Sequence, residues 1–239
     1  MTERVESIVV EARTHGRYLV RAPEGEPAGI LVGFHGYMEW AARHLGELER
    51  IPGADRWALV AVDALSSFYS RSSGSGQVVR GWMTRDLREK AIEDNVRYVR
   101  SILDAVRARF DWRLPVVLAG FSQGASMAWR AALLAGHEIA AVVALAGDVP
   151  PELATLHAAS PFPGRALIAR GDGDEWYDAA KLATDVERLA GRATQVDTLT
   201  FAGGHEWSDA FREKAGELLA ELSPRAAASS RRSRANAGS

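Results

Sequence analysis

Residues 118–126 read Leu-Ala-Gly-Phe-Ser-Gln-Gly-Ala-Ser, and the prediction of the fold starts from these nine residues. It contains the pattern Gly-x-Ser-x-Gly, with Ser122 at its centre. A serine in a sharp turn between a strand and a helix has a strained backbone, and glycines two positions away keep such a turn free of steric clashes. An apolar segment precedes the pattern, and a segment rich in Ala, Leu and Met follows it. The sequence therefore predicts a strand over 114–118, a turn that exposes the serine, and a helix over 125–135.

The composition is that of a globular protein with a large core. The chain has 239 residues, of which 47% are apolar and 25% charged, which suits one α/β domain. Its net charge of −2 gives no reason to expect a nucleic-acid partner. The absence of cysteine excludes disulfides, thiolate catalysis and cysteine metal sites.

The N-terminal residues give no reason to expect a targeting signal. The N-terminus lacks a signal-peptide pattern, and no apolar run is long enough to cross a bilayer. We therefore expect a cytoplasmic protein without membrane insertion. One domain is expected over residues 1–222, followed by a disordered tail rich in Ala, Ser and Arg over 223–239.

From residue 29 onward, apolar strand patterns alternate with amphipathic helix patterns. Strands are predicted over 29–34, 57–62, 114–118, 139–146, 165–169 and 195–201, and helices over 41–51, 84–110, 125–135, 179–189 and 208–222. The strands are uniformly apolar, which is typical of a mostly parallel sheet with helices on both faces. Residues 7–13 and 17–21 predict an opening hairpin, and residues 64–81 predict a long loop. In such sheets, active residues gather on the loops that follow the carboxyl ends of the strands.

Polar side chains at three of these strand ends predict a catalytic serine with its base and its acid. The Ser122 hydroxyl is a weak nucleophile and needs an adjacent base to accept its proton. His205 follows two glycines at the end of the last predicted strand, where its ring can reach the serine. Asp174 is the preferred carboxylate partner of that imidazole, and Asp172 is expected to stabilise its own turn. Asp148 and Asp172 remain alternative acids at this stage.

Two backbone N–H groups are expected to stabilise the charge of a tetrahedral intermediate. Gln123 N–H begins the helix after the serine, and Tyr37 N–H lies in the loop after the strand 29–34. Six aromatic residues on or near strand-end loops are candidates for substrate binding: Trp40, Phe68, Tyr69, Trp82, Trp176 and Trp207. The acidic turn 172–175 lacks the pattern of an EF-hand calcium loop, so we expect no metal and no cofactor.

Over roughly residues 29–222, these motifs resemble the phospholipase/carboxylesterase branch of the α/β-hydrolases. The matching stretches are Gly120-Phe121-Ser122-Gln123-Gly124, Phe34-His35-Gly36, Gly171-Asp172-Gly173-Asp174 and Gly203-Gly204-His205, with Trp82 in the place of a family tryptophan. The order of serine, acid and base is also that of α/β-hydrolases. The resemblance implies an α/β-hydrolase fold with a mostly parallel central sheet, helices on both faces and no large lid domain.

The chain departs from the family pattern at two places. The family commonly has Gly-x-Gly-Asp after the histidine, where this chain has Gly36-Tyr37-Met38-Glu39. It often has a proline-rich segment after the acid, where this chain has Glu175-Trp176-Tyr177. Both departures lie where a substrate would bind, so the resemblance implies the fold and the chemistry more firmly than the substrate.

Residues and resemblance together predict a carboxylesterase-type serine hydrolase. It would cleave small-molecule esters of small or medium acyl groups through an acyl-enzyme on Ser122. A thioesterase or an amidase would use the same three residues, because the same acyl-enzyme serves all three reactions. A hydrolase-fold protein that binds a small ligand without turnover is a further interpretation. The sequence leaves these alternatives open, together with a homodimeric state.

Overall fold

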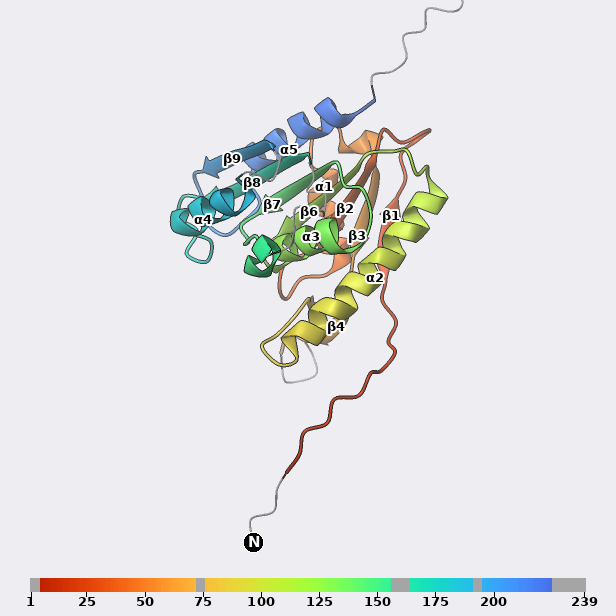
Figure 1. The fold of residues 1–239 in the computed structure, drawn as a ribbon. Coiled ribbons are helices and arrows are strands. Elements are labelled where there is room, and N and C mark those ends of the chain that lie inside the picture. The colour runs from red at the N-terminus through yellow and green to blue at the C-terminus, as the bar shows by residue number, and fades with distance from the viewer. Residues whose placement is uncertain (1–4, 72–75, 156–163, 191–194, 225–239) are drawn as a thin grey trace, which may run out of the picture.

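The computed structural model describes residues 5–71, 76–155, 164–190 and 195–224, and its central element is a seven-stranded sheet (Figure 1). The strands are β1 (Tyr18–Arg21), β2 (Ile30–Phe34), β3 (Ala58–Val62), β6 (Val116–Phe121), β7 (Ala141–Leu145), β8 (Arg165–Gly171) and β9 (Gln195–Phe201). Their order is β1-β3-β2-β6-β7-β8-β9, and of these seven only β1 runs antiparallel to its neighbour. The sheet is thus the mostly parallel one that the uniformly apolar strands predicted.

Helices cover both faces of this sheet (Figure 1). One face carries α1 (Ala41–Glu49) and α5 (Asp209–Leu222), and the other carries α2 (Arg88–Arg109), α3 (Gln123–Leu134) and α4 (Ala179–Leu189). Alternate residues of one strand enter the two cores. In β2, Val32 packs with the α2 and α3 side, whereas Leu31 packs with the α1 and α5 side. All residues of β2 are therefore buried.

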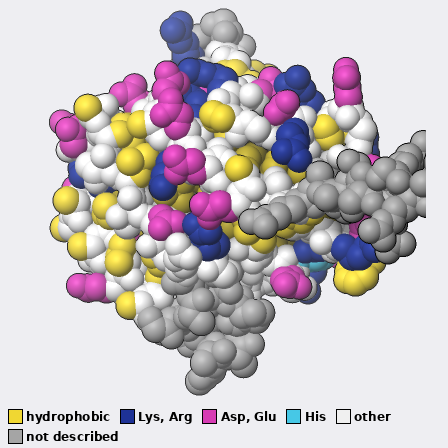
Figure 2. Space-filling model, turned by 90° about the horizontal axis from the view of Figure 1, so that it is seen from above, with side chains coloured by type: hydrophobic (Ala, Val, Ile, Leu, Met, Phe, Trp, Pro, Cys, Tyr) yellow, Lys and Arg dark blue, Asp and Glu magenta, His cyan; other side chains and the backbone are white. Residues whose placement is uncertain are grey.

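Polar contacts join the last helix to the first one across the same face. Arg212 pairs with Glu47, and Arg50 Nη2 lies 3.2 Å from Asp209 Oδ1. The Ser208 side chain caps α5. Figure 2 shows the molecule from above the view of Figure 1, and acidic and basic side chains are interspersed on this face. Such mixed charge suits side chains that pair locally.

The predicted opening hairpin is wrong. Residues 5–17 contain no strand, and β1 pairs with β3, with Tyr18 opposite Val62. Arg17 fixes this pairing, because its guanidinium lies 2.7 Å from the buried Asp63 carboxylate and its carbonyl accepts the Asp63 N–H at 2.9 Å. The contact that decides the pairing is distant in sequence, so the local strand pattern could not reveal it.

The segment 64–81, predicted as a loop, holds a two-stranded antiparallel ribbon. Its strands are β4 (Ser66–Tyr69) and β5 (Val78–Gly81), and residues 72–75 between them lie outside the described ones. β5 also bridges to Glu39 through Arg80, which ties the ribbon to the loop after β2. α2 begins at Arg88 rather than at residue 84, and no side chain caps its start.

Among the described helices, none is both long and apolar enough to cross a membrane. The short 3-10 helices η1 (Ala54–Arg56) and η2 (Pro151–Thr155) complete the described elements. Residues 225–239, which make up most of the tail predicted to be disordered, lie outside the described part of the chain.

Candidate active site

Ser122 lies in the turn between β6 and α3, at φ 54° and ψ −122°. This backbone conformation is rare for a residue with a side chain. The neighbouring glycines have no room for a side chain: a Cβ on Gly120 would lie 2.3 Å from the Gly124 carbonyl oxygen, and one on Gly124 would lie 2.0 Å from the Phe34 carbonyl oxygen. Gly120 is therefore needed for the start of α3 to lie close to β6, and Gly124 for it to pack against the end of β2.

The structure brings Ser122, His205 and Asp174 into one hydrogen-bonded chain. Ser122 Oγ lies 2.8 Å from His205 Nε2, and His205 Nδ1 lies 2.9 Å from Asp174 Oδ2. Asp174 is 3% exposed, whereas Ser122 and His205 are half-buried, so solvent or a small molecule can reach the serine side of the chain. With the Nδ1 proton directed to the carboxylate, Nε2 is free to accept the serine proton.

Backbone groups hold the Asp174 carboxylate in place. Its Oδ1 accepts the N–H groups of Trp176 at 2.8 Å and of Tyr177 at 2.9 Å. The buried Tyr177 hydroxyl in turn donates to Asp185 Oδ2 at 2.9 Å, and burial raises the pKa of Asp185. Asp185 also accepts the Val149 N–H at 2.8 Å, which connects α4 to the loops after β7 and β8.

The alternative acids are placed differently. Asp172 Oδ1 accepts the Gly203 N–H at 3.0 Å, so this side chain ties its own turn to the loop that carries His205. Asp148 receives the Ser126 hydroxyl on its backbone carbonyl at 3.0 Å. Within the described residues, no group of three or more His, Asp or Glu side chains is arranged to hold a metal ion.

The loop after β2 approaches the serine turn from the other side. His35 is fully buried, its Nε2 accepts the Ala64 N–H at 3.1 Å, and its Nδ1 donates to the Gly36 carbonyl at 2.7 Å. Burial lowers the pKa of His35, so the ring is neutral near pH 7. Glu39 Oε2 accepts the Gly36 N–H at 2.9 Å. Among the described residues, the Tyr37 and Gln123 N–H groups donate to no backbone carbonyl.

The six candidate aromatic residues fall into different environments. Trp176 is 74% exposed, Tyr69 is 60% exposed, and Trp40 and Phe68 are half-buried. Trp207 is also half-buried, and its ring centroid lies 6.1 Å from that of Phe121.

Trp82 does not fit the predicted role in substrate binding, because its side chain is fully buried. Its indole N–H donates to the His35 carbonyl at 2.8 Å, so it contacts the loop after β2 rather than the surface. Residue type alone does not indicate this burial. Nor does it indicate the contacts of Glu39 and Tyr177, whose partners follow only from the shapes of the two loops.

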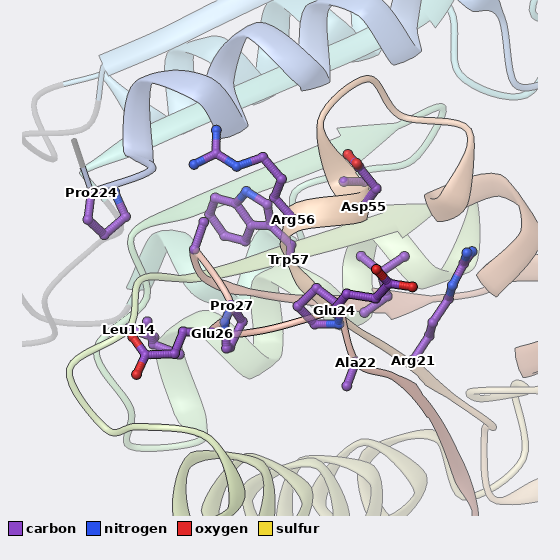
Figure 3. Close-up of a pocket in the computed structure, with 14 residues that line it drawn as sticks. Arg21, Ala22, Glu24, Glu26, Pro27, Asp55, Arg56, Trp57, Leu114 and Pro224 are labelled. Carbon is purple, nitrogen blue, oxygen red and sulfur yellow. The ribbon is translucent and has the colours of Figure 1, made fainter. Parts of the chain in front are cut away.

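A cavity of about 890 Å³ lies at the opposite end of the sheet (Figure 3). It is lined by the segment after β1, by η1 and by Pro224, with Arg21, Glu24 and Arg56 among its charged side chains. No serine or histidine is among the described residues that line it. Ser122 and His205 therefore lie away from this cavity.

Comparison with known proteins agrees with this geometry. The model of the phospholipase/carboxylesterase family matches residues 79–215, more than half of the chain. No curated protein matches the sequence.

Several solved structures have a similar fold, and this chain aligns with nearly the whole length of each of them. A Bacillus cereus carboxylesterase has 17% identity and a TM-score of 0.64, over 87% of this chain and 94% of that one. A phospholipase/carboxylesterase from Dyadobacter fermentans DSM 18053 has 15% identity and a TM-score of 0.66, over 86% and 97%. Esterase PE8 has 23% identity and a TM-score of 0.65, over 87% and 98%. The fold is therefore that of the α/β-hydrolases, and the chain belongs to the phospholipase/carboxylesterase family.

Proposed function

We propose that this protein is a serine hydrolase that cleaves carboxylic esters of small or medium acyl groups through an acyl-enzyme on Ser122. Membership of the family supports hydrolysis of the esterase or thioesterase type. The observation that carries the finer proposal is the chain from Ser122 Oγ through the His205 ring to Asp174, with separations of 2.8 Å and 2.9 Å. These are the distances required for proton transfer from a nucleophile to a base that a carboxylate orients.

In the acylation step, Ser122 Oγ attacks the ester carbonyl carbon while its proton passes to His205 Nε2. The imidazolium that forms is stabilised by the Asp174 carboxylate, which stays ionised. The protonated Nε2 then donates to the alcohol oxygen as the C–O bond breaks, and the alcohol leaves. The acyl group remains as an ester on Ser122.

In the deacylation step, water replaces the alcohol. His205 Nε2 accepts a proton from this water as the water oxygen attacks the acyl carbonyl. The proton returns to Ser122 Oγ when the serine ester breaks, and a carboxylic acid is released. Both half-reactions use the same imidazole tautomer, which the two N–H donors on Asp174 Oδ1 help to maintain by fixing the carboxylate.

The N–H groups of Gln123 and Tyr37 are proposed to bind the oxyanion in both steps. Neither is used by a backbone carbonyl among the described residues, so both are available to a ligand. Gln123 lies at the first turn of α3, where the helix dipole also favours negative charge. Removing one such donor from an enzyme of this type lowers kcat by about 100-fold to 1000-fold.

The surroundings of the serine favour a small or medium acyl group on an accessible ester. Tyr37 is 50% exposed, Met38 is 42% exposed and Trp176 is 74% exposed on the loops around Ser122 and Asp174. These side chains offer apolar surface without enclosing the site. The solved structures of similar fold include a carboxylesterase and an esterase, which supports the same substrate class.

The test is labelling with a fluorophosphonate probe, combined with hydrolysis of a p-nitrophenyl ester series. We expect the wild type to be labelled, Ser122→Ala to show no labelling, and His205→Ala to be labelled much more slowly. For the acid, Asp174→Asn is compared with the matched control Asp172→Asn, because the Asp172 carboxylate contacts Gly203 rather than His205. Matched ester, thioester and anilide substrates then rank the three acyl-transfer reactions. A folded wild type that is neither labelled nor active on any of them would refute the proposal and favour a ligand-binding protein.

A further inference from the structure

The two proposed oxyanion donors belong to separate parts of the fold. Tyr37 N–H comes from the loop after β2, and Gln123 N–H comes from the start of α3. Preorganised donors stabilise an oxyanion only when both lie about 2.7–3.1 Å from it, so the position of one loop relative to the other must be fixed.

Trp82 and Met83, which follow β5, contact both parts. The Trp82 indole N–H donates to the His35 carbonyl at 2.8 Å, on the side of the β2 loop. The Trp82 backbone N–H donates to Gln123 Oε1 at 2.7 Å, and Gln123 Nε2 donates to the Met83 carbonyl at 2.9 Å. One short segment is thus hydrogen-bonded to His35, in the loop that carries one donor, and to the side chain of Gln123, the other donor residue.

Trp82 is itself held rigidly. Asn95 Nδ2 donates to its backbone carbonyl at 2.9 Å. Its ring centroid lies 5.5 Å from that of Phe34 and 5.3 Å from that of His35, and the side chain has no exposed surface. A buried indole is expected to use its N–H, and here the acceptor is the backbone of the loop after β2.

The effect on the donor follows from peptide geometry. The peptide group between His35 and Gly36 is held at its oxygen by Trp82 and at its nitrogen by Glu39. The next carbonyl, of Gly36, accepts from His35 Nδ1 at 2.7 Å. Because a trans peptide directs its N–H opposite to its C=O, fixing the Gly36 carbonyl also fixes the direction of the Tyr37 N–H.

We propose that Trp82, together with the Gln123 side chain, is a positioning element that sets the separation of the two oxyanion donors. It does not touch the substrate. The inference rests on the proposed function, since it concerns the geometry of that same site. It assigns Trp82 a role in transition-state stabilisation in place of the substrate contact that its residue type suggested.

The test is Trp82→Phe, with Trp129→Phe as the matched control. Phenylalanine keeps an aromatic ring against Phe34 and removes the N–H that binds the His35 carbonyl. Trp129 is equally buried, but its Nε1 has no hydrogen-bond partner among the described residues, so the control removes a similar volume without that contact. The readouts are kcat and KM for a p-nitrophenyl ester and the inhibition constant of a trifluoromethyl ketone, which forms a tetrahedral adduct on the serine.

We expect Trp82→Phe to lower kcat by about 10-fold to 100-fold with KM changed by less than about twofold, and to weaken the trifluoromethyl ketone by a similar factor. Trp129→Phe should stay within about threefold of the wild type in each quantity. If Trp82→Phe does not fold, Gln123→Met cuts the other end of the same element and should give the same pattern.

Two results would overturn the inference. One is a Trp82→Phe variant that matches Trp129→Phe in kcat and in ketone affinity. The other is a loss confined to KM, which would mean that Trp82 binds the substrate after all. A wild type without hydrolysis or probe labelling would instead refute the proposed function itself, so the two failures are distinguishable.

Discussion

We expect the buried His44 to make the stability of the folded protein sensitive to acid. It lies on α1, is 1% exposed, and neither ring nitrogen has a hydrogen-bond partner within ordinary limits among the described residues. Its ring centroid is 5.5 Å from that of Trp207. Burial, and then repulsion from His35, lowers the pKa of His44 from 6.5 to about 3, while the nearby Ala119 backbone opposes the shift.

The size of the effect follows from proton linkage. The unfolded chain binds a proton at His44 as the pH falls through 6.5, whereas the folded chain remains neutral there until the pH is near 3. Each pKa unit corresponds to about 1.36 kcal/mol, so between pH 7 and pH 5 this one group lowers the free energy of unfolding by about 2 kcal/mol. The contribution of neutral His44 to the free energy of unfolding is therefore fully present above pH 6.5 and is lost progressively as the pH falls below that value.

Urea unfolding at pH 7 and pH 5 measures this loss. We compare the wild type with His44→Met, whose flexible apolar side chain fills the buried space without a titrating group. The difference in free energy of unfolding between the two pH values should be smaller in His44→Met than in the wild type by about 2 kcal/mol. His15→Gln, at an exposed position, should behave like the wild type. Equal pH dependence in wild type and His44→Met would refute the reasoning.

Two further predictions concern the acid loop. Asp174→Asn should lower kcat by about 1000-fold to 10000-fold in ester hydrolysis with little change in KM, because the amide would hold the wrong His205 tautomer; a loss below tenfold would contradict the assignment. Tyr177→Phe should lower the free energy of unfolding in urea by about 1–3 kcal/mol, because the buried Asp185 carboxylate loses a donor. The same variant should leave kcat within about threefold of the wild type, since the Tyr177 backbone N–H still donates to Asp174. A large loss of kcat with unchanged stability would show that the hydroxyl acts on the chemistry instead.

The sheet and its covering helices could be predicted because their signals are local. A run such as β7 is uniformly apolar because both of its faces are covered, and α4 and β9 have the predicted bounds. The family expected from the motifs is likewise confirmed by the match over residues 79–215. The residues at the strand ends could be named because parallel strands deliver their carboxyl ends to one edge of the sheet. Their catalytic roles stay predictions until variants are measured.

Pairings between distant segments could not be predicted in the same way. The prediction of an opening hairpin was wrong because β1 pairs with β3 instead. Arg17, next to β1, contacts Asp63, which lies too far along the chain for the local sequence pattern to reveal the pairing. The ribbon of β4 and β5 could not be predicted for a different reason, although its two strands are close in sequence. Its strands have four residues each and β4 is largely exposed, so the segment shows no continuous buried pattern of its own. It is ordered by its own pairing and by the bridge from Arg80 to Glu39.

Side-chain direction is the other quantity that residue type does not reveal. Trp82 and Trp176 are both aromatic residues next to strand-end segments, yet one has no exposed surface and the other is 74% exposed. Trp82 packs against Phe34 and His35, which are far away in the sequence, and the His35 carbonyl accepts its indole N–H. A fully buried indole cannot contact a substrate, so any effect of Trp82 on the proposed reaction must act through the loop that it binds. Under the proposed function, Trp82 therefore bears on the proposed oxyanion site, and we expect substrate contacts at exposed side chains such as Trp176.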